Sequence, residues 1–143
     1  MQDDQWVRLD AQPESGADIR GDTTRVVIAD DRAEIRDFIE FNLENDGFDV
    51  AAFENGVDCW RHLEWFGPPD AVVLDVMMPG MSGIEVLQRI RETDRLAEVP
   101  VLLLTSRGRE EDVARGFDAG ATYYMAKPFG LQDLRSRLRS VVD

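Results

Sequence analysis

Acidic residues stand at the ends of two apolar runs in this sequence, where they could hold a hard metal ion. Asp30 and Asp31 follow the run Val26–Ala29, and Asp75 lies near the end of the run Ala71–Val76. Carboxylate oxygens are the ligands that Mg2+ prefers, and a carboxylate can act as a nucleophile toward phosphorus. These residues predict magnesium-assisted phosphoryl chemistry if the fold brings them together.

A hydroxyl and an ammonium group follow two other apolar runs. Thr105 comes after Val101–Leu104, and Lys127 comes after Thr122–Ala126. Lys127 is the one lysine among 16 basic residues, all the others being arginine. Either this is chance, or the site needs a compact point charge that the planar fork of arginine would not reproduce.

The elements that must position these side chains alternate regularly from Arg25 onward. Short apolar runs rich in β-branched residues alternate with segments whose apolar residues recur at helical spacing. The expected strands are 26–29, 48–53, 71–76, 101–104 and 122–126. The expected helices carry Ile35, Phe38, Ile39 and Leu43; Val57, Trp60 and Leu63; Ile84, Leu87 and Ile90; Val113 and Phe117; and Leu131, Leu134, Leu138 and Val141. Five such pairs predict an α/β fold, with a parallel sheet covered by helices on both faces.

In an open parallel sheet, ligands bind beyond the carboxyl ends of the strands. The five polar residues named above are therefore expected at one edge of the sheet. Three carboxylates there would repel one another by a few kcal/mol per pair, roughly, at an effective dielectric constant near 20. The predicted cluster therefore requires a cation.

Four motifs, in this order, resemble the receiver domain of two-component response regulators. They are IADD, LDVMMPGMSGIEVL, LLLTSR and GATYYMAKPF, and the resemblance extends from about Arg25 to the end of the chain. It implies a doubly wound, flavodoxin-like sheet of five strands in the order 2-1-3-4-5, with five helices. We expect 24–143 to form the receiver domain and 1–23 to form a flexible acidic N-terminal extension.

The resemblance also implies a role for each acidic residue. Asp75 would accept a phosphoryl group from the phosphohistidine of a sensor histidine kinase or phosphotransfer protein. Mg2+ would be bound directly by Asp31 and Asp75, mainly through water by Asp30, and by the backbone carbonyl of Met77. The expected protein is thus a phosphoacceptor switch, which catalyses only its own phosphorylation and dephosphorylation.

The same resemblance assigns the residues around the phosphoryl group. Thr105 and Lys127 would each contact one of its oxygens. Thr105 would then move, Tyr124 would rotate inward, and the face formed by the fourth helix, fifth strand and fifth helix would bind an output protein that the sequence does not identify. Pro128 resembles the family's cis proline, although the sequence alone indicates only a turn there.

Two further roles are expected at the rim of the site. Met77 and Arg107 would flank the approach of hydrolytic water and so set the lifetime of the acyl phosphate. The kinase would dock on the first helix around Ile35 and Phe38, and on the loop near Phe129.

The sequence departs from receivers that dimerise and bind DNA, which commonly carry Gly-Ala-Asp-Asp-Tyr where this chain has Gly120–Tyr124. We therefore expect a monomer or a weak, phosphorylation-dependent dimer. Because the sequence ends at the fifth helix, we also expect a stand-alone receiver without a DNA-binding output domain.

Two other functions are compatible with parts of this pattern. Phosphatases of the haloacid dehalogenase type also use a strand-end aspartate and magnesium, but they need a second acid two residues later, where Met77 stands. A receiver-shaped module that no longer needs phosphate is disfavoured because all five site side chains are present.

Composition excludes several other classes of protein. A formal charge of −13 opposes direct binding to nucleic acid or to anionic membranes. The lone cysteine, Cys59, allows neither an internal disulfide nor a thiolate metal cluster. The sequence has no apolar run of membrane-spanning length and no basic start followed by an apolar segment, so we expect a cytoplasmic protein.

Simpler structural roles are also expected or remain open. Asp30 and Asp31 could cap the following helix, and Ser82 is expected to cap the third helix. We expect His62, the one histidine, to be a partly exposed helix residue. Trp65 is expected to be a packing residue, as are Trp60 and Phe66.

Overall fold

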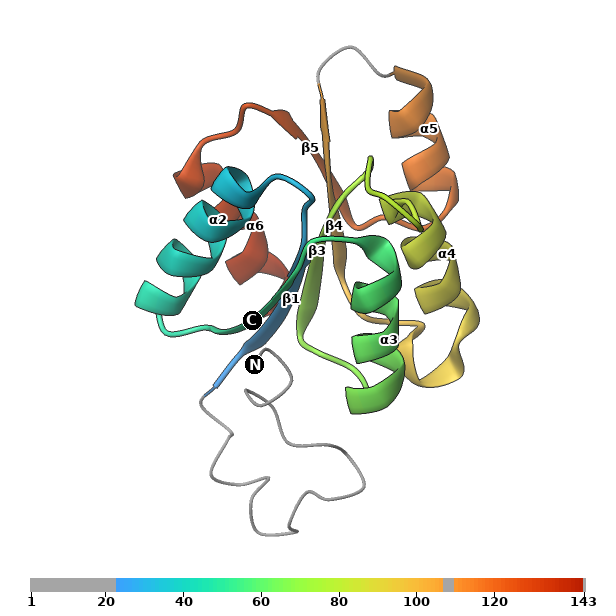
Figure 1. Cartoon of the computed structure of the whole chain (residues 1–143), viewed down its shortest axis with the longest axis horizontal. Coiled ribbons are helices and arrows are strands. Elements are labelled where there is room, and N and C mark those ends of the chain that lie inside the picture. Colours follow the sequence, from blue (N-terminus) through green and yellow to red (C-terminus); the bar gives the residue numbers. More distant parts are fainter. Residues whose placement is uncertain (1–22, 107–109, 143) are drawn as a thin grey trace, which may run out of the picture.

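The computed structural model describes residues 23–106 and 110–142, which form a parallel sheet between two layers of helices (Figure 1). The strands are β1 (Arg25–Ala29), β2 (Asp49–Phe53), β3 (Ala71–Asp75), β4 (Val101–Ser106) and β5 (Tyr123–Lys127). The helices are α2 (Ala33–Asn45), α3 (Gly56–Phe66), α4 (Gly83–Glu92), α5 (Glu110–Asp118), α6 (Leu131–Val142) and the short 3-10 helix η4 (Asp94–Leu96). The strand order is β2-β1-β3-β4-β5, as expected.

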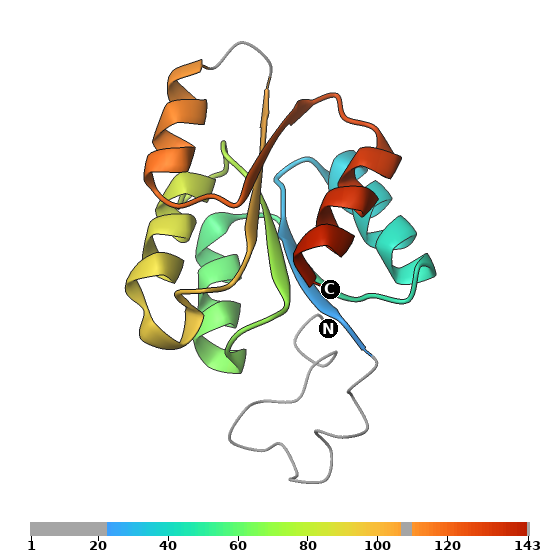
Figure 2. The ribbon, with the colours of Figure 1, turned by 180° about the vertical axis from the view of Figure 1, so that it is seen from behind.

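The two layers explain why the strands read as continuous apolar runs. Helices α2 and α6 cover one face of the sheet and α3, α4 and α5 cover the other, as the front and back views show (Figures 1 and 2). Along β1, Val27 packs into the core beneath α3 and α4, whereas Ile28 packs into the core beneath α2. Both are essentially inaccessible to solvent. Because the strand is buried on both faces, its sequence is continuously apolar and does not alternate between apolar and polar residues.

Local signals set the ends of several helices. Ser82 caps α4 and forms a reciprocal capping box with Glu85, which confirms the expected cap. Asn55 caps α3 by accepting a hydrogen bond from the backbone N–H of Asp58. The C-terminal end of α2 is followed by Gly47 at a φ of 98°, which is a conformation that favours glycine.

Arginine side chains hold α6 against its neighbours. Arg135 donates to both carboxylate oxygens of Asp46, which follows α2. The Arg137 guanidinium lies 4.8 Å from the centre of the Tyr123 ring on β5. These contacts link α6 to the rest of its layer through charge and ring stacking as well as through its apolar face.

Two expectations about α3 were wrong. His62 is only 4% exposed, and its ring centre lies 4.9 Å from that of Phe53 and 4.6 Å from that of Phe66. Trp65 is 52% exposed, although Trp60 and Phe66 are packing residues as expected. The helical repeat places His62 on the wide buried side of α3 and Trp65 on its solvent side.

Parts of two expectations lie outside the described residues. These are Arg107 and all but the last residue of the extension 1–23. Within the described ranges, none of the helices has the length and hydropathy needed to cross a lipid bilayer.

Candidate metal centre

Three carboxylates meet where β1 and β3 end. Oxygen atoms of Asp30, Asp31 and Asp75 all lie within 4.8 Å of one another, with Asp30 and Asp75 buried and Asp31 exposed. Octahedral Mg2+ with bonds of about 2.1 Å separates its ligand oxygens by about 3 to 4.2 Å. The three carboxylates are therefore close enough to share one ion after small movements, and their hard oxygens suit Mg2+.

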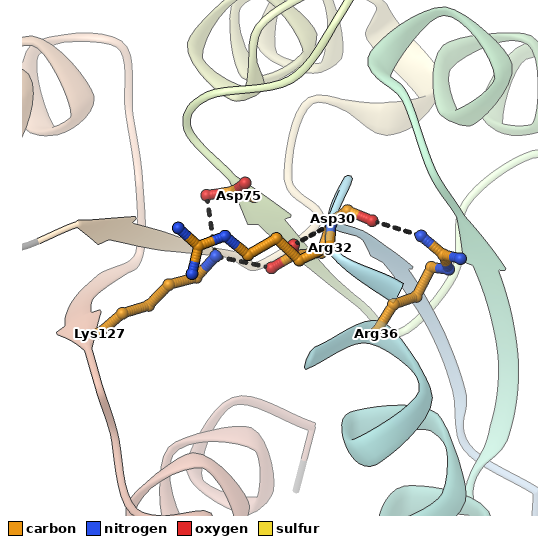
Figure 3. Close-up of polar contacts among 5 residues, drawn as sticks. All are labelled: Asp30, Arg32, Arg36, Asp75 and Lys127. Carbon is orange, nitrogen blue, oxygen red and sulfur yellow. Dashed lines mark hydrogen bonds and ion pairs between the residues drawn. The ribbon is translucent and has the colours of Figure 1, made fainter. Parts of the chain in front are cut away.

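Lys127 lies between two of these carboxylates. Its Nζ is 2.8 Å from Oδ2 of Asp30 and 3.3 Å from Oδ1 of Asp75 (Figure 3). The Lys127 side chain is 11% exposed, so the ammonium partly neutralises two carboxylates, those of Asp30 and Asp75, that have little access to water. The peptide bond between Lys127 and Pro128 is cis.

Asp30 is held through every polar atom it carries. Its N–H donates to the carbonyl of Phe53 at 3.0 Å, and its carbonyl accepts from Nη1 of Arg36 at 2.9 Å. Oδ1 accepts from the backbone N–H of Arg32 at 2.9 Å, and Oδ2 accepts from Lys127 (Figure 3). Since the N-cap position of α2 is held by Arg32 and no side chain caps that helix, Asp30 stabilises the turn before α2 rather than capping it.

The environment of Asp75 opposes its charge. Burial, together with the nearby Asp30 carboxylate, raises the pKa of Asp75 to about 6, even though Lys127 acts in the opposite direction. The side chain is 7% exposed, so water screens the carboxylates poorly. A cation bound here would lower the pKa of Asp75 and keep it ionised, which is the form that can act as a nucleophile.

Two glycines allow the segment after β3 to fold closely over neighbouring backbone. A Cβ on Gly83, the first residue of α4, would lie 2.3 Å from the Asp75 carbonyl oxygen. A Cβ on Gly56 would lie 1.9 Å from the Met81 carbonyl oxygen. Gly56 and Gly83 therefore position the segment that carries Met77, whose side chain is 53% exposed.

The other predicted site residues lie around this centre or further away. Thr105 is buried, and the residue before it on β4, Leu104, is the register partner of Asp75. Tyr124 on β5 is half-buried, with its ring centre 6.1 Å from that of the exposed Phe117 on α5.

The residues expected at the docking surface differ in exposure. Phe38 is 48% exposed on α2. Ile35 and Phe129 are only half-buried and pack against the same core cluster. Phe38 is therefore the most accessible apolar side chain of the predicted three.

One contact and one surface feature of the site were not predicted from the sequence. Arg36 is not among the site residues predicted above, yet it donates a hydrogen bond to the backbone carbonyl of Asp30. Its signal was that it is the one basic residue in an otherwise acidic helix segment. An open groove of about 490 Å³ also borders Asp31, and it is lined by Asp31, Glu54, Asn55, Val57, Asp58, Pro79 and Gly80. The metal centre is thus reachable from the solvent side through Asp31.

Residues 26–139 match the family model of the response regulator receiver domain. The DNA-binding dual master transcriptional regulator RpaA of Synechocystis is 38% identical over 118 residues, which are 82% of this chain and 48% of that protein. The chain spans about half the length of the curated relatives it matches.

Solved receiver structures have the same fold. The chemotaxis protein CheY4 of Vibrio cholerae superposes with a TM-score of 0.77 at 28% identity, covering 83% of this chain and 98% of that one. The receiver domain of the sensor histidine kinase PA1611 of Pseudomonas aeruginosa, which has a magnesium ion coordinated in its active site cleft, gives a TM-score of 0.77 at 25% identity, with 84% and 98% covered.

This chain belongs to the response regulator receiver family of two-component signal transduction. Receiver domains are phosphoacceptor switches that bind Mg2+ at an acidic site and interact with histidine kinases or phosphotransfer proteins.

Proposed function

We propose that Asp75 is the phosphoacceptor of this receiver. A carboxylate oxygen of Asp75 attacks the phosphorus of a phosphohistidine on a sensor histidine kinase or phosphotransfer protein; the P–N bond breaks and an acyl phosphate forms. The observation that carries the proposal is the convergence of Asp75, two further carboxylates and the Lys127 ammonium in one cluster, in which Asp30 and Asp75 are buried and Asp31 faces solvent.

The residues around Asp75 have two roles, binding of the metal ion and binding of the phosphoryl group. Asp31, Asp75 and the backbone carbonyl of Met77 would hold Mg2+ directly, and Asp30 would hold it mainly through water. When bound, the ion would neutralise the negative charge that the carboxylates and the phosphoryl group share. Lys127 donates to one phosphoryl oxygen. Its place beside both buried aspartates supports this role, because it needs little movement to reach a group on Asp75.

Thr105 and Tyr124 transmit the phosphorylation state to the surface. The Thr105 hydroxyl binds a phosphoryl oxygen and moves toward Asp75, and the half-buried Tyr124 ring turns into the space that Thr105 leaves. The face formed by α5, β5 and α6 then changes its affinity for an output protein or for a second copy of the chain. Gly116 on α5 supports this route, since a Cβ there would lie 3.1 Å from the Tyr124 ring.

Hydrolysis of the acyl phosphate returns the switch to its resting state. We propose that Met77 flanks the path of the attacking water, so that its bulk sets the lifetime of the phosphorylated form. The same role is predicted for Arg107, which lies outside the described residues. The exposed side chain of Met77, two residues beyond the phosphoacceptor, supports this assignment. The domain acts on its own phosphoryl group and not on a separate substrate.

The kinase docks on α2 and on the loop after β5, with Ile35, Phe38 and Phe129 as contacts. The 48% exposed ring of Phe38 supports this surface. Phe38→Ala tests docking because it should slow phosphotransfer from the kinase while leaving phosphorylation by acetyl phosphate unchanged. Charge reversal at Arg36 would be a poor test, since Arg36 also bonds the turn of the metal centre.

Incubation with acetyl phosphate and Mg2+, followed by intact-mass spectrometry, tests the proposed function. The wild type should gain the mass of one phosphoryl group in the presence of Mg2+ and none with EDTA. Asp75→Asn should gain none in either condition. Phosphorylation of Asp75→Asn to the same extent as the wild type would refute the assignment. Release of phosphate from ester substrates would instead favour the phosphatase reading.

A further inference from the structure

Arg36 on α2 contacts the turn that carries two of the three clustered carboxylates. Its Nη1 donates to the Asp30 carbonyl oxygen at 2.9 Å, and the side chain is half-buried (Figure 3). We propose that Arg36 is a positioning residue for the metal, which fixes the peptide between Asp30 and Asp31 and so aims the Asp31 carboxylate into the cluster. The inference rests on the proposed function because it concerns the same magnesium centre.

The geometry of the turn explains how a contact to a carbonyl can orient the next side chain. The carbonyl of Asp30 and the N–H of Asp31 belong to one planar peptide unit. A hydrogen bond that fixes the Asp30 carbonyl therefore also fixes the orientation of the Asp31 N–H and the direction in which the Asp31 backbone continues. The carboxylate and N–H of Asp30 are already bonded to Lys127, Arg32 and Phe53. Arg36 supplies the bond to the carbonyl, which is the atom closest to Asp31.

The position of Arg36 in its helix supports the same reading. Arg36 lies in the first turn of α2, where the helix dipole disfavours a positive charge. It is the one basic residue among the four acids of that helix, which are Glu34, Asp37, Glu40 and Glu44. Helix stability alone would place an acid at this position, so the contact with Asp30 is the better explanation for an arginine there.

The strongest competing explanation is a charge effect. Glu40 follows Arg36 by four residues; burial raises its pKa, as do Glu44 and Asp37, and Arg36 opposes this shift. If Arg36 acted only through its charge, removing it would make the site more negative and would tighten Mg2+ binding. Loss of positioning predicts the opposite sign, namely weaker binding.

Calorimetric titration of the full chain with MgCl2 separates the two explanations. Arg36→Met, which removes the donors but keeps an unbranched chain, should weaken Mg2+ binding by about tenfold, as removal of groups that orient metal ligands commonly does. Arg36→Lys should rescue most of this loss, because an ammonium can still donate to the carbonyl. Glu40→Gln, which removes the helix neighbour without touching the turn, should leave the affinity unchanged.

A second measurement distinguishes positioning from a role in the chemistry. At saturating Mg2+, Arg36→Met should be phosphorylated by acetyl phosphate within about twofold of the wild-type rate, since the loss lies in metal affinity. Circular dichroism in EDTA checks the fold, and Arg36→Gln replaces Arg36→Met if the latter does not fold.

The outcomes are distinct. Arg36→Met binding Mg2+ as tightly as the wild type, or more tightly, overturns the inference and leaves the proposed function standing. A wild type that is not phosphorylated by acetyl phosphate in the presence of Mg2+ overturns the proposed function itself. Weaker binding in Arg36→Met together with rescue in Arg36→Lys supports the positioning role.

Discussion

Lys127 and Asp30 are 97 residues apart in the chain, yet their side chains meet at 2.8 Å in the least accessible part of the metal centre. The contact pairs the one lysine of the protein with a carboxylate that is 2% exposed. A buried charge pair of this kind is costly to break from one side, because the remaining charge is left without a partner.

Lys127→Arg should preserve the charge but impair the chemistry. The planar guanidinium cannot occupy the narrow position between Asp30 and Asp75 in the way that the compact ammonium does. We expect phosphorylation by acetyl phosphate to slow by about tenfold or more. This is less than the roughly 10²–10³-fold cost of losing one donor to a developing charge, because the positive charge is kept. The rate of phosphoprotein formation, followed by mass spectrometry, measures this; a wild-type rate would contradict it.

Asp75→Asn should stabilise the metal-free protein near neutral pH. The pKa of Asp75 in the folded state is raised to about 6, so ionisation of this group above pH 6 disfavours the folded state. The substitution removes this penalty. We therefore expect the free energy of unfolding to increase by about 1 to 2 kcal/mol after allowing for solvent screening.

The pH dependence of this effect checks its origin. Below the unfolded pKa, Asp75 is neutral in both states and the penalty is absent. The gain from Asp75→Asn should therefore shrink when urea unfolding in EDTA is repeated at about pH 5 instead of about pH 7.5. A gain that stays constant across this range would point to packing rather than charge.

Mg2+ should raise the thermal stability of the protein in a saturable way. An ion that binds only the folded state at ten times its dissociation constant adds about 1.4 kcal/mol. The midpoint of unfolding should rise with MgCl2 and fall back on addition of EDTA. Asp31→Asn, which alters the exposed ligand, should show a much smaller rise; an equal rise would mean that Mg2+ binds elsewhere.

Gly83→Ala should destabilise both the fold and the site. The new Cβ would lie 2.3 Å from the Asp75 carbonyl oxygen, so α4 or the end of β3 must shift. We expect the free energy of unfolding to decrease by about 1 to 3 kcal/mol, which is the usual cost of overpacking. Gly130→Ala is the matched control, because a Cβ there meets nothing within 4 Å. Equal losses in the two variants, measured by urea unfolding, would contradict the steric argument.

The sequence by itself determined the order of the elements and the residues at the strand ends. The β-branched runs, the helical spacing and the cap at Ser82 are local signals, and each was confirmed in the structure. The convergence of Asp30, Asp75 and Lys127 followed from these signals, because parallel strands bring their carboxyl ends to one edge.

Only the tertiary structure decided which atoms of these residues meet and which neighbours hold them. The bond from Arg36 to the Asp30 carbonyl, the burial of His62 between two phenyl rings and the exposure of Trp65 each run against the expectation from residue type or position. The spacing of apolar residues predicts which face of a helix or strand is buried. The direction of a side chain and its hydrogen-bond partner depend on how that face packs against elements that are distant in the sequence.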